Sequence, residues 1–107
     1  MLNVAIRRVA EGEVDRLRWW MGELMRRRDE VIETFQNEGV RHEVAYLISL
    51  AGESILVYVA DVDDPEQAGA AFRSSTLPID QEHKEVMGRV LAGQIHAELL
   101  YDVHVSA

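Results

Sequence analysis

Hydrophobic and polar positions repeat with two different periods along the chain, and each change of period marks a predicted element. From Leu2 to Val9 every second residue is apolar, which is typical of a strand with one buried face. From Gly12 to Gln36 apolar residues recur at steps of three and four. This spacing predicts one long helix of about seven turns. The helix is expected to end near Gly39, because glycine readily takes the left-handed conformation that closes helices.

Strict alternation returns after this helix and predicts a β-hairpin. Val40–Leu50 and Ser54–Ala60 are the two alternating segments, and the short Ala51-Gly52-Glu53 sequence between them is suited to a tight connection. The two strands are therefore expected to pair antiparallel.

Two short helices and a last strand complete the predicted order. Asp64 followed by proline predicts a helix start, with the helix running over 65–72. Pro78 and Gly93 bound a second helical piece over 79–92, and the segment 95–105 alternates again. The order is β-α-β-β-α-β with a divided second helix, so we predict one α+β domain over 1–107. Its expected fold is ferredoxin-like: an antiparallel sheet with helices on one face.

The predicted strands carry more apolar residues than one covered face needs. In the last segment one row is apolar from Ile95 to Val105, and the opposite row still includes Leu100. The face without helices would then expose apolar area, which is typical of an interface. We predict a homodimer in which two sheets pack face to face; the alternative is a monomer with a solvated second face.

Composition excludes several classes of protein. Of 107 residues 48% are hydrophobic and 28% charged, which predicts a folded domain and not a disordered segment. With no cysteine there is no disulfide, thiolate metal site or cysteine nucleophile. No apolar run is long enough to span a bilayer and no signal-peptide pattern begins the chain, so a cytoplasmic location is expected. The net charge of −8 argues against nucleic acid as a partner.

Two charged residues fall at positions where charge is costly. On a helical projection Arg28 lies within the apolar stripe of the long helix, so it requires a carboxylate or an anionic ligand. It either binds an anion at the floor of a pocket, or pairs with Glu43 or Glu98 from a sheet face, or extends into water at a helix end. Glu43 itself points to solvent, to a dimer partner or, if the strand has a bulge, to the helices, where it would be a candidate general base.

The strongest local candidate for chemistry is the pair Asp80 and His83. The two residues are three apart at the start of a helix and share a face, so Asp80 would orient an imidazole that moves protons near neutral pH. The alternative is that Asp80 only caps the helix.

Other polar side chains complete the candidate site. Tyr46 and Tyr58 lie on neighbouring predicted strands and would line one cavity, and Ser75 supplies a hydroxyl beside the helix break. The four histidines lack the spacing of a local metal motif, so no metal or other cofactor is expected. Glycine-rich phosphate loops and the G-x-S-x-G pattern are also missing from the sequence.

The chain resembles a family of small prokaryotic proteins described as a domain of unknown function, family 6176. The resemblance rests on single residues spread over nearly the whole chain: Trp20, Leu24, Arg28, Glu30, Thr34, Glu38-Gly39-Val40, Glu43, Tyr46-Leu47, Tyr58, Asp63, Ser75, Ile79-Asp80, His83 and Glu98-Leu99-Leu100. Phe35 and Tyr46 stand where Leu and Phe are expected.

More distantly, the order of elements is similar to the dimeric α/β-barrel superfamily, which includes rhamnose mutarotases, quinol monooxygenases, polyketide cyclases and haem-degrading enzymes. This resemblance implies a ligand cavity between sheet and helices, although fold alone transfers no activity. The resulting hypothesis is a cofactor-free acid–base enzyme of the isomerase, mutarotase or cyclase type, acting on a small polar or anionic ligand. His83 would carry the proton, Arg28 would hold an oxygen, and Glu43, Tyr46, Tyr58 and Ser75 would line the cavity. The alternatives are a non-catalytic binding or assembly module and haem binding through His83.

Overall fold

The alternating segments form one antiparallel sheet in the computed structural model, which describes residues 1–106. Its strands are β1 (Leu2–Val9), β2 (Val40–Leu50), β3 (Glu53–Val62) and β4 (Leu91–Ile95), in the spatial order β2-β3-β1-β4. Every neighbouring pair runs antiparallel. The first strand and the hairpin predicted from alternation are therefore confirmed.

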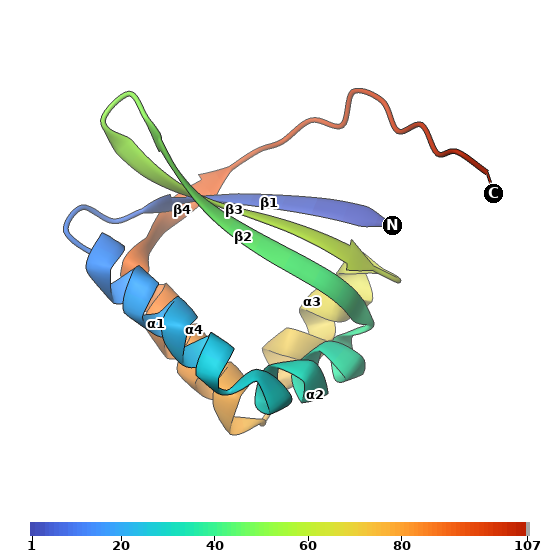
Figure 1. Ribbon diagram of the computed structural model, residues 1–107, viewed down its shortest axis with the longest axis horizontal. Coiled ribbons are helices and arrows are strands. Elements are labelled where there is room, and N and C mark those ends of the chain that lie inside the picture. Colours follow the sequence, from blue (N-terminus) through green and yellow to red (C-terminus); the bar gives the residue numbers. More distant parts are fainter. Residues whose placement is uncertain (107) are drawn as a thin grey trace.

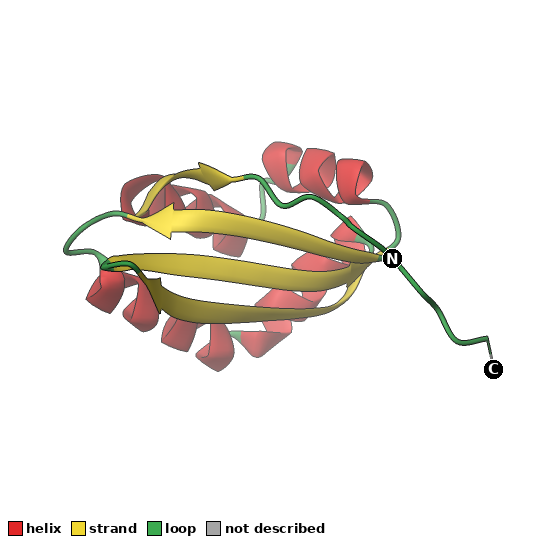
Figure 2. Cartoon of the chain, turned by 90° about the horizontal axis from the view of Figure 1, so that it is seen from above, coloured by secondary structure: helices red, strands yellow, loops and turns green. Residues whose placement is uncertain are grey.

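The helices are α1 (Val14–Arg26), α2 (Arg28–Glu38), α3 (Pro65–Ser74) and α4 (Pro78–Val90). All of them lie on the same side of the sheet and leave its other side uncovered (Figures 1 and 2). Local signals mark several ends as predicted. Asp64 caps α3 by accepting from the backbone N–H groups of Glu66 and Gln67, and Gly39 closes α2 in the left-handed conformation.

The prediction of one continuous helix over 12–36 was wrong, because the chain bends at Arg27. This residue has a non-helical backbone (φ −103°, ψ 41°), and its guanidinium binds Glu30 in the next helix and Glu82 in α4. One non-helical residue barely shifts the spacing of apolar positions, so periodicity alone does not reveal the break. The bend gives the helical layer its V shape, with α1 beside α4 and α2 beside α3 (Figure 1).

The prediction of a last strand over 95–105 was also wrong. Strand β4 begins earlier, at Leu91, and ends at Ile95, after which the chain leaves the sheet as an extended segment. Alternation describes a segment suited to a strand, but a strand also needs a hydrogen-bonded neighbour. The last helix correspondingly ends at Val90, two residues before the predicted end at Ala92.

The register of the strands shows which residues face the helices. Leu56 lies opposite Arg7 in β1 and Leu47 in β2, and since directly paired residues share a face, all three point toward the helical layer. The more apolar row of β1, which begins at Leu2 and Val4, points the other way and is exposed. On β1 and β2 the more apolar row therefore points outward and the more polar row inward.

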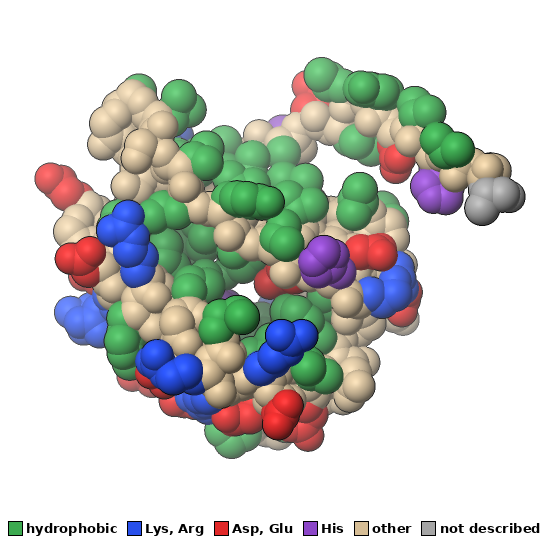
Figure 3. Space-filling view, in the orientation of Figure 1, with side chains coloured by type: hydrophobic (Ala, Val, Ile, Leu, Met, Phe, Trp, Pro, Cys, Tyr) green, Lys and Arg blue, Asp and Glu red, His purple; other side chains and the backbone are tan. Residues whose placement is uncertain are grey.

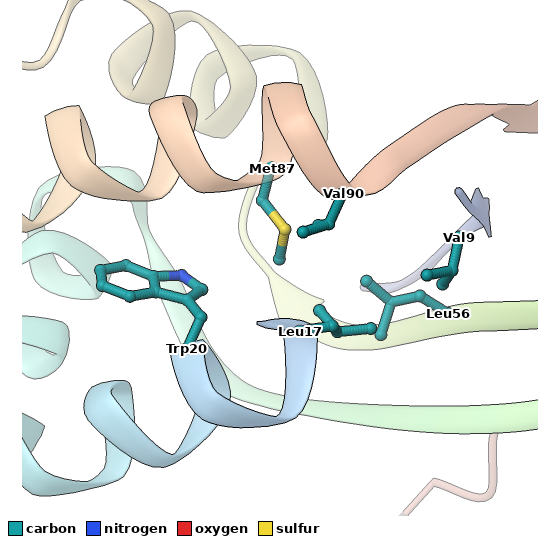
Figure 4. Packing of buried hydrophobic residues seen from close by; sticks show 6 residues of the cluster. All are labelled: Val9, Leu17, Trp20, Leu56, Met87 and Val90. Carbon is teal, nitrogen blue, oxygen red and sulfur yellow. The ribbon is translucent and has the colours of Figure 1, made fainter. Parts of the chain in front are cut away.

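The hydrophobic core occupies the end of the molecule where α1 and α4 cross the sheet. Its fully buried members come from both layers: Val9, Leu17, Trp20, Leu56, Met87 and Val90 (Figure 4). The α2 end has fewer buried apolar residues, and the interior there is polar. Across residues 1–106, none of the helices combines the length and the apolar character required to cross a membrane.

Candidate functional site

An inward-facing carboxylate lies on β2, at Glu43. The pairing of β2 with β3 shifts register between Val40 and His42, and beyond the shift Glu43 lies opposite Ala60, a buried residue of the helix-covered face. The interpretation in which an irregular strand turns Glu43 toward the helices is therefore the correct one. Burial raises the pKa of Glu43 to about 7.

Tyr58 lies beside Glu43 on the same face of the sheet. Its hydroxyl is buried and has no hydrogen-bond partner within residues 1–106. Burial and the charge of Glu43 raise the pKa of this hydroxyl, while Arg7 on β1 acts in the opposite direction. An unpaired buried hydroxyl is costly in free energy, and natural structures rarely keep one without a use.

A second carboxylate with a raised pKa comes from the end of α2. The pKa of Glu38 is raised to about 7 by burial and then by the negative charges of Asp80 and Glu43. The hydroxyl of Thr34 acts in the opposite direction. Glu38, Glu43 and Tyr58 therefore form one electrostatically coupled group, and both carboxyls titrate close to neutral pH.

Asp80 is buried on α4 and forms hydrogen bonds with α2 and with the turn before α4. One of its carboxylate oxygens, Oδ2, accepts hydrogen bonds from the hydroxyls of Thr34 on α2 and Ser75 before α4, each at 2.5 Å. Only 3% of Asp80 is exposed, so these donors supply the hydrogen bonds that a buried carboxylate requires. Ser75 also accepts from the backbone N–H of Leu77, which orders the turn into α4.

Replacing Thr34 by valine should therefore destabilise the protein. The change keeps the shape of the side chain but removes one donor to a buried carboxylate, which costs about 2 kcal/mol in the free energy of unfolding. Urea denaturation measures the loss. Thr76→Val is the matched control, because Thr76 is exposed, and it should leave stability nearly unchanged. Equal effects of the two changes would contradict the role given to Asp80.

His83 is oriented by Trp20 and not by Asp80. The indole N–H of Trp20 donates to Nδ1 of His83 at 2.8 Å, and the ring of Phe72 meets the imidazole edge-on. With Nδ1 accepting, the neutral imidazole carries its proton on Nε2. Burial lowers the pKa of His83 to about 4, although the charge of Asp80 acts against this shift.

The predicted Asp80–His83 pair is therefore corrected. The two side chains share the first turns of α4, but the hydroxyls of Thr34 and Ser75 take the carboxylate, and Trp20 takes the imidazole. With its pKa lowered to about 4, the imidazole is neutral at pH 7, and with Nδ1 accepting from Trp20 its free N–H is at Nε2.

We expect His83 to remain neutral down to about pH 5. Nitrogen-15 NMR of the imidazole should show the Nε2-protonated form at pH 7 and a midpoint near pH 4. His83→Gln assigns the signal. A midpoint above pH 6, or a proton on Nδ1, would contradict the hydrogen bond from Trp20.

Of the alternatives for Arg28, the structure shows the one in which the side chain extends into water at a helix end, and its placement within a continuous apolar stripe was wrong. Arg28 is the first residue of α2 and is exposed, because the bend at Arg27 rotates the second half of the predicted helix away from the projected stripe. Neither Glu43 nor Glu98 forms an ion pair with it within the described chain. The cation whose charge acts on Tyr58 is instead Arg7.

The two tyrosines do not line one cavity. Tyr46 pairs with Val57, whereas Tyr58 pairs with Ala45, so the rings lie on opposite faces of the sheet. Tyr46 is 60% exposed on the face without helices. Because successive residues of a strand point to opposite faces, the register between β2 and β3 decides whether the two rings share a face.

A surface groove lies between α1 and the hairpin. Its volume is about 350 Å³, and it is lined by Leu17, Arg18, Met21, Ala45, Leu47 and Leu56. Ala45 is the direct partner of Tyr58 in the sheet, so the groove borders the strand pair that carries Tyr58, although the Tyr58 side chain is not part of its lining. The space-filling view is hollowed between the sheet and the helical layer (Figure 3). We call Glu38, Glu43, Tyr58 and Arg7 together with this groove the central site.

Metal binding is not indicated by the carboxylates. Within the 106 residues described, no group of three His, Asp or Glu side chains is arranged to hold a metal ion. The groups of the central site influence one another's pKa values without forming a ligand set.

Sequence reasoning missed two members of the central site. Arg7 belongs to the more polar row of β1, which a strand of this type usually turns toward solvent, and Glu38 looks like an ordinary polar residue at a helix end. The pattern of a single strand held no signal for Arg7, because alternation does not state which of its two rows the helices cover.

The chain was also compared with known proteins. One family model matches residues 3–106, and its description is Family of unknown function (DUF6176). No curated protein and no solved structure matches the chain.

Proposed function

The chain belongs to this family of unknown function, and we propose that it binds a small uncharged molecule in the central site and catalyses a cofactor-free proton transfer on it. The observation that most supports this proposal is the buried hydroxyl of Tyr58. It has no hydrogen-bond partner among the described residues and lies beside Glu43, whose carboxyl has a pKa of about 7. A hydrogen-bond donor next to a group that ionises near neutral pH is the minimum required for acid–base chemistry.

The charges of the site favour an uncharged ligand. Glu38, Glu43 and Asp80 are all acidic, and Arg7 is a single cation that acts on Tyr58, so an anionic molecule would meet net repulsion. The groove is mostly apolar, with Arg18 at its margin. A molecule with an apolar part in the groove and a carbonyl or hydroxyl at Tyr58 fits both surroundings.

Each group then has a distinct role. Tyr58 donates a hydrogen bond to the carbonyl or hydroxyl oxygen of the ligand and stabilises negative charge that develops there. Glu43, once ionised, accepts a proton from the adjacent atom of the ligand and returns it in an isomerisation. Glu38 is a positioning residue whose own pKa is raised by burial and by the charges of Asp80 and Glu43, so its ionisation competes with that of Glu43.

We also infer that the subunit is ferredoxin-like and forms a homodimer of the dimeric α/β-barrel type. The strand order β2-β3-β1-β4 with helices on one side supports the first point. The second is supported by the outward apolar rows: Leu2 is 70% exposed, Tyr46 60% and Leu50 63%. Monomers rarely expose a continuous apolar surface of this kind.

Matched probes with one ring and different head groups test the ligand class. Cyclohexanone, cyclohexanol and cyclohexanecarboxylate are added separately, and binding is followed by ligand-observed NMR at pH 7.5. We expect the ketone and the alcohol to bind and the carboxylate to be rejected. Tyr58→Phe should weaken binding about fivefold or more, since one hydrogen bond is lost. Tyr46→Phe on the opposite face is the control and should change nothing.

The same ketone tests the reaction. In D₂O, hydrogen exchange beside the carbonyl of cyclohexanone should be accelerated by the protein and lost in Glu43→Gln. Binding without accelerated exchange would favour the non-catalytic binding module. Preferential binding of the carboxylate, or no effect of Tyr58→Phe, would contradict the proposed site.

A further inference from the structure

The segment after β4 is extended, exposed and strongly apolar on one side. From Leu99 onward every second residue is apolar, and Tyr101, Val103 and Val105 are 80%, 76% and 87% exposed. In Figure 1 this segment leaves β4, runs on the side of the sheet that carries no helices and passes beyond the N-terminal end of β1. We call residues 97–105 the arm.

The sheet of the same chain is too short to cover the arm. Strand β4 pairs antiparallel with β1 at Ile95 and Ile6, and continuing that register would place Leu99 opposite Leu2. Strand β1 itself begins at Leu2, so Tyr101, Val103 and Val105 would have no residue of β1 opposite them. Folding back onto its own subunit therefore leaves the apolar row of the arm in water.

The outer face of the sheet, which no helix covers, is apolar like the arm. The outer rows of the sheet are apolar from Leu2 and Val4 on β1 to Tyr46 and Ile48 on β2. The space-filling view shows hydrophobic side chains both on the sheet and along the arm (Figure 3). Each copy thus carries an apolar arm and an apolar face that its own chain does not cover.

We propose that the arm of each copy packs along the outer sheet face of a second copy, with Tyr101, Val103 and Val105 pointing into the interface. This inference rests on the dimer proposed above and adds an exchanged segment to it. The polar row of the arm, with Asp102 and His104, then faces water. The alternation that predicted a strand is explained by a neighbour that belongs to another chain.

Because the sequence contains no cysteine, a single introduced cysteine can be labelled specifically in the full chain. His104→Cys places a single spin label on the polar row of the arm and leaves the apolar row intact. Spin-labelled chains at natural isotope abundance are mixed with ¹⁵N chains that carry no spin label, and the mixture is unfolded and refolded together. We expect the amide signals of Val4, Tyr46 and Val59 in the ¹⁵N chains to lose intensity. A label at Gln36→Cys on α2 should leave them unchanged.

Two kinds of outcome overturn the proposal and can be told apart by sedimentation equilibrium of the wild type. A dimeric mass without intensity loss between chains leaves the dimer intact and removes the arm exchange. Intensity loss only when label and isotope share a chain likewise removes the arm exchange alone, whereas a monomeric mass removes both.

A pair of charge-matched variants gives an independent readout. Val103→Lys should raise the dissociation constant of the dimer about tenfold or more, because two buried valines are lost from each dimer. His104→Lys adds the same charge on the other row and should leave the constant unchanged. Equal effects would overturn the orientation of the arm.

Discussion

Replacing Glu43 by glutamine should stabilise the protein above pH 7, by about 3 kcal/mol in the free energy of unfolding. The reason is that the folded chain holds this carboxyl in a buried place where the charged form is disfavoured, with a pKa of about 7 compared with 4.5 in the unfolded chain. Glutamine has the shape of the protonated acid but does not ionise.

The sign of the effect follows from the two pKa values. Below pH 4.5 both states are protonated and Glu43 has no effect on stability. Between pH 4.5 and 7 the unfolded state releases its proton while the folded state keeps it, so stability falls as the pH rises. Above pH 7 both states are ionised and the full cost is present. Glu38, with a pKa also raised to about 7, contributes in the same direction.

Urea denaturation of the wild type and of Glu43→Gln at pH 5.5 and 8.5 measures the difference. The lowered pKa of His83 makes stability rise with pH between about 4 and 6.5, so the comparison between variants isolates Glu43. Glu33→Gln, at an exposed position on α2, is the control and should leave the pH dependence unchanged. The variant should exceed the wild type in free energy of unfolding by more at pH 8.5 than at pH 5.5. An equal or smaller difference at pH 8.5 would contradict a buried carboxyl.

If the expected gain appears, it supports a functional reading of the central site. A residue that lowers stability at neutral pH, beside a tyrosine with an unpaired hydroxyl, does not serve the fold. Natural chains keep such residues where binding or catalysis needs them.

Local patterns predicted most elements of the fold. Alternation identified β1 and the hairpin, and the residues at Asp64 and Gly39 marked helix ends through hydrogen bonds that involve only near neighbours. These features are encoded within a few residues and survive in the structure. The bend at Arg27 is different, because the ion pair with Glu82 joins residues far apart in sequence.

Face assignment limited the prediction of the candidate site. Alternation divides a strand into two rows but does not state which row the helices cover, and the more apolar row is normally taken as the inner one. On β1 the more polar row is the inner one, so this assumption would place Arg7 on the outer face. Glu43 and Tyr58 were identified, yet Tyr46 was placed with them because the register between β2 and β3 is not visible in the sequence.

The reversed faces lead to the second large effect, which concerns assembly. Val59 lies on the outer row of β3, between Val4 of β1 and Val44 of β2, near the middle of the uncovered face. Val59→Lys should raise the dissociation constant of the proposed dimer about 100-fold or more, because each copy would bury a charge without a partner. The isolated subunit should stay folded, since the new side chain reaches water on a free face.

Sedimentation equilibrium measures the constant, and thermal unfolding checks the subunit. Gln36→Lys adds the same charge at an exposed position on α2 and should leave the dimer intact. If Val59→Lys dissociates the dimer while the central site still binds cyclohexanone, assembly and ligand binding use opposite faces of one sheet. A dimer that tolerates lysine at this position would show that the outer apolar rows are not the interface, and the arm would then need another surface.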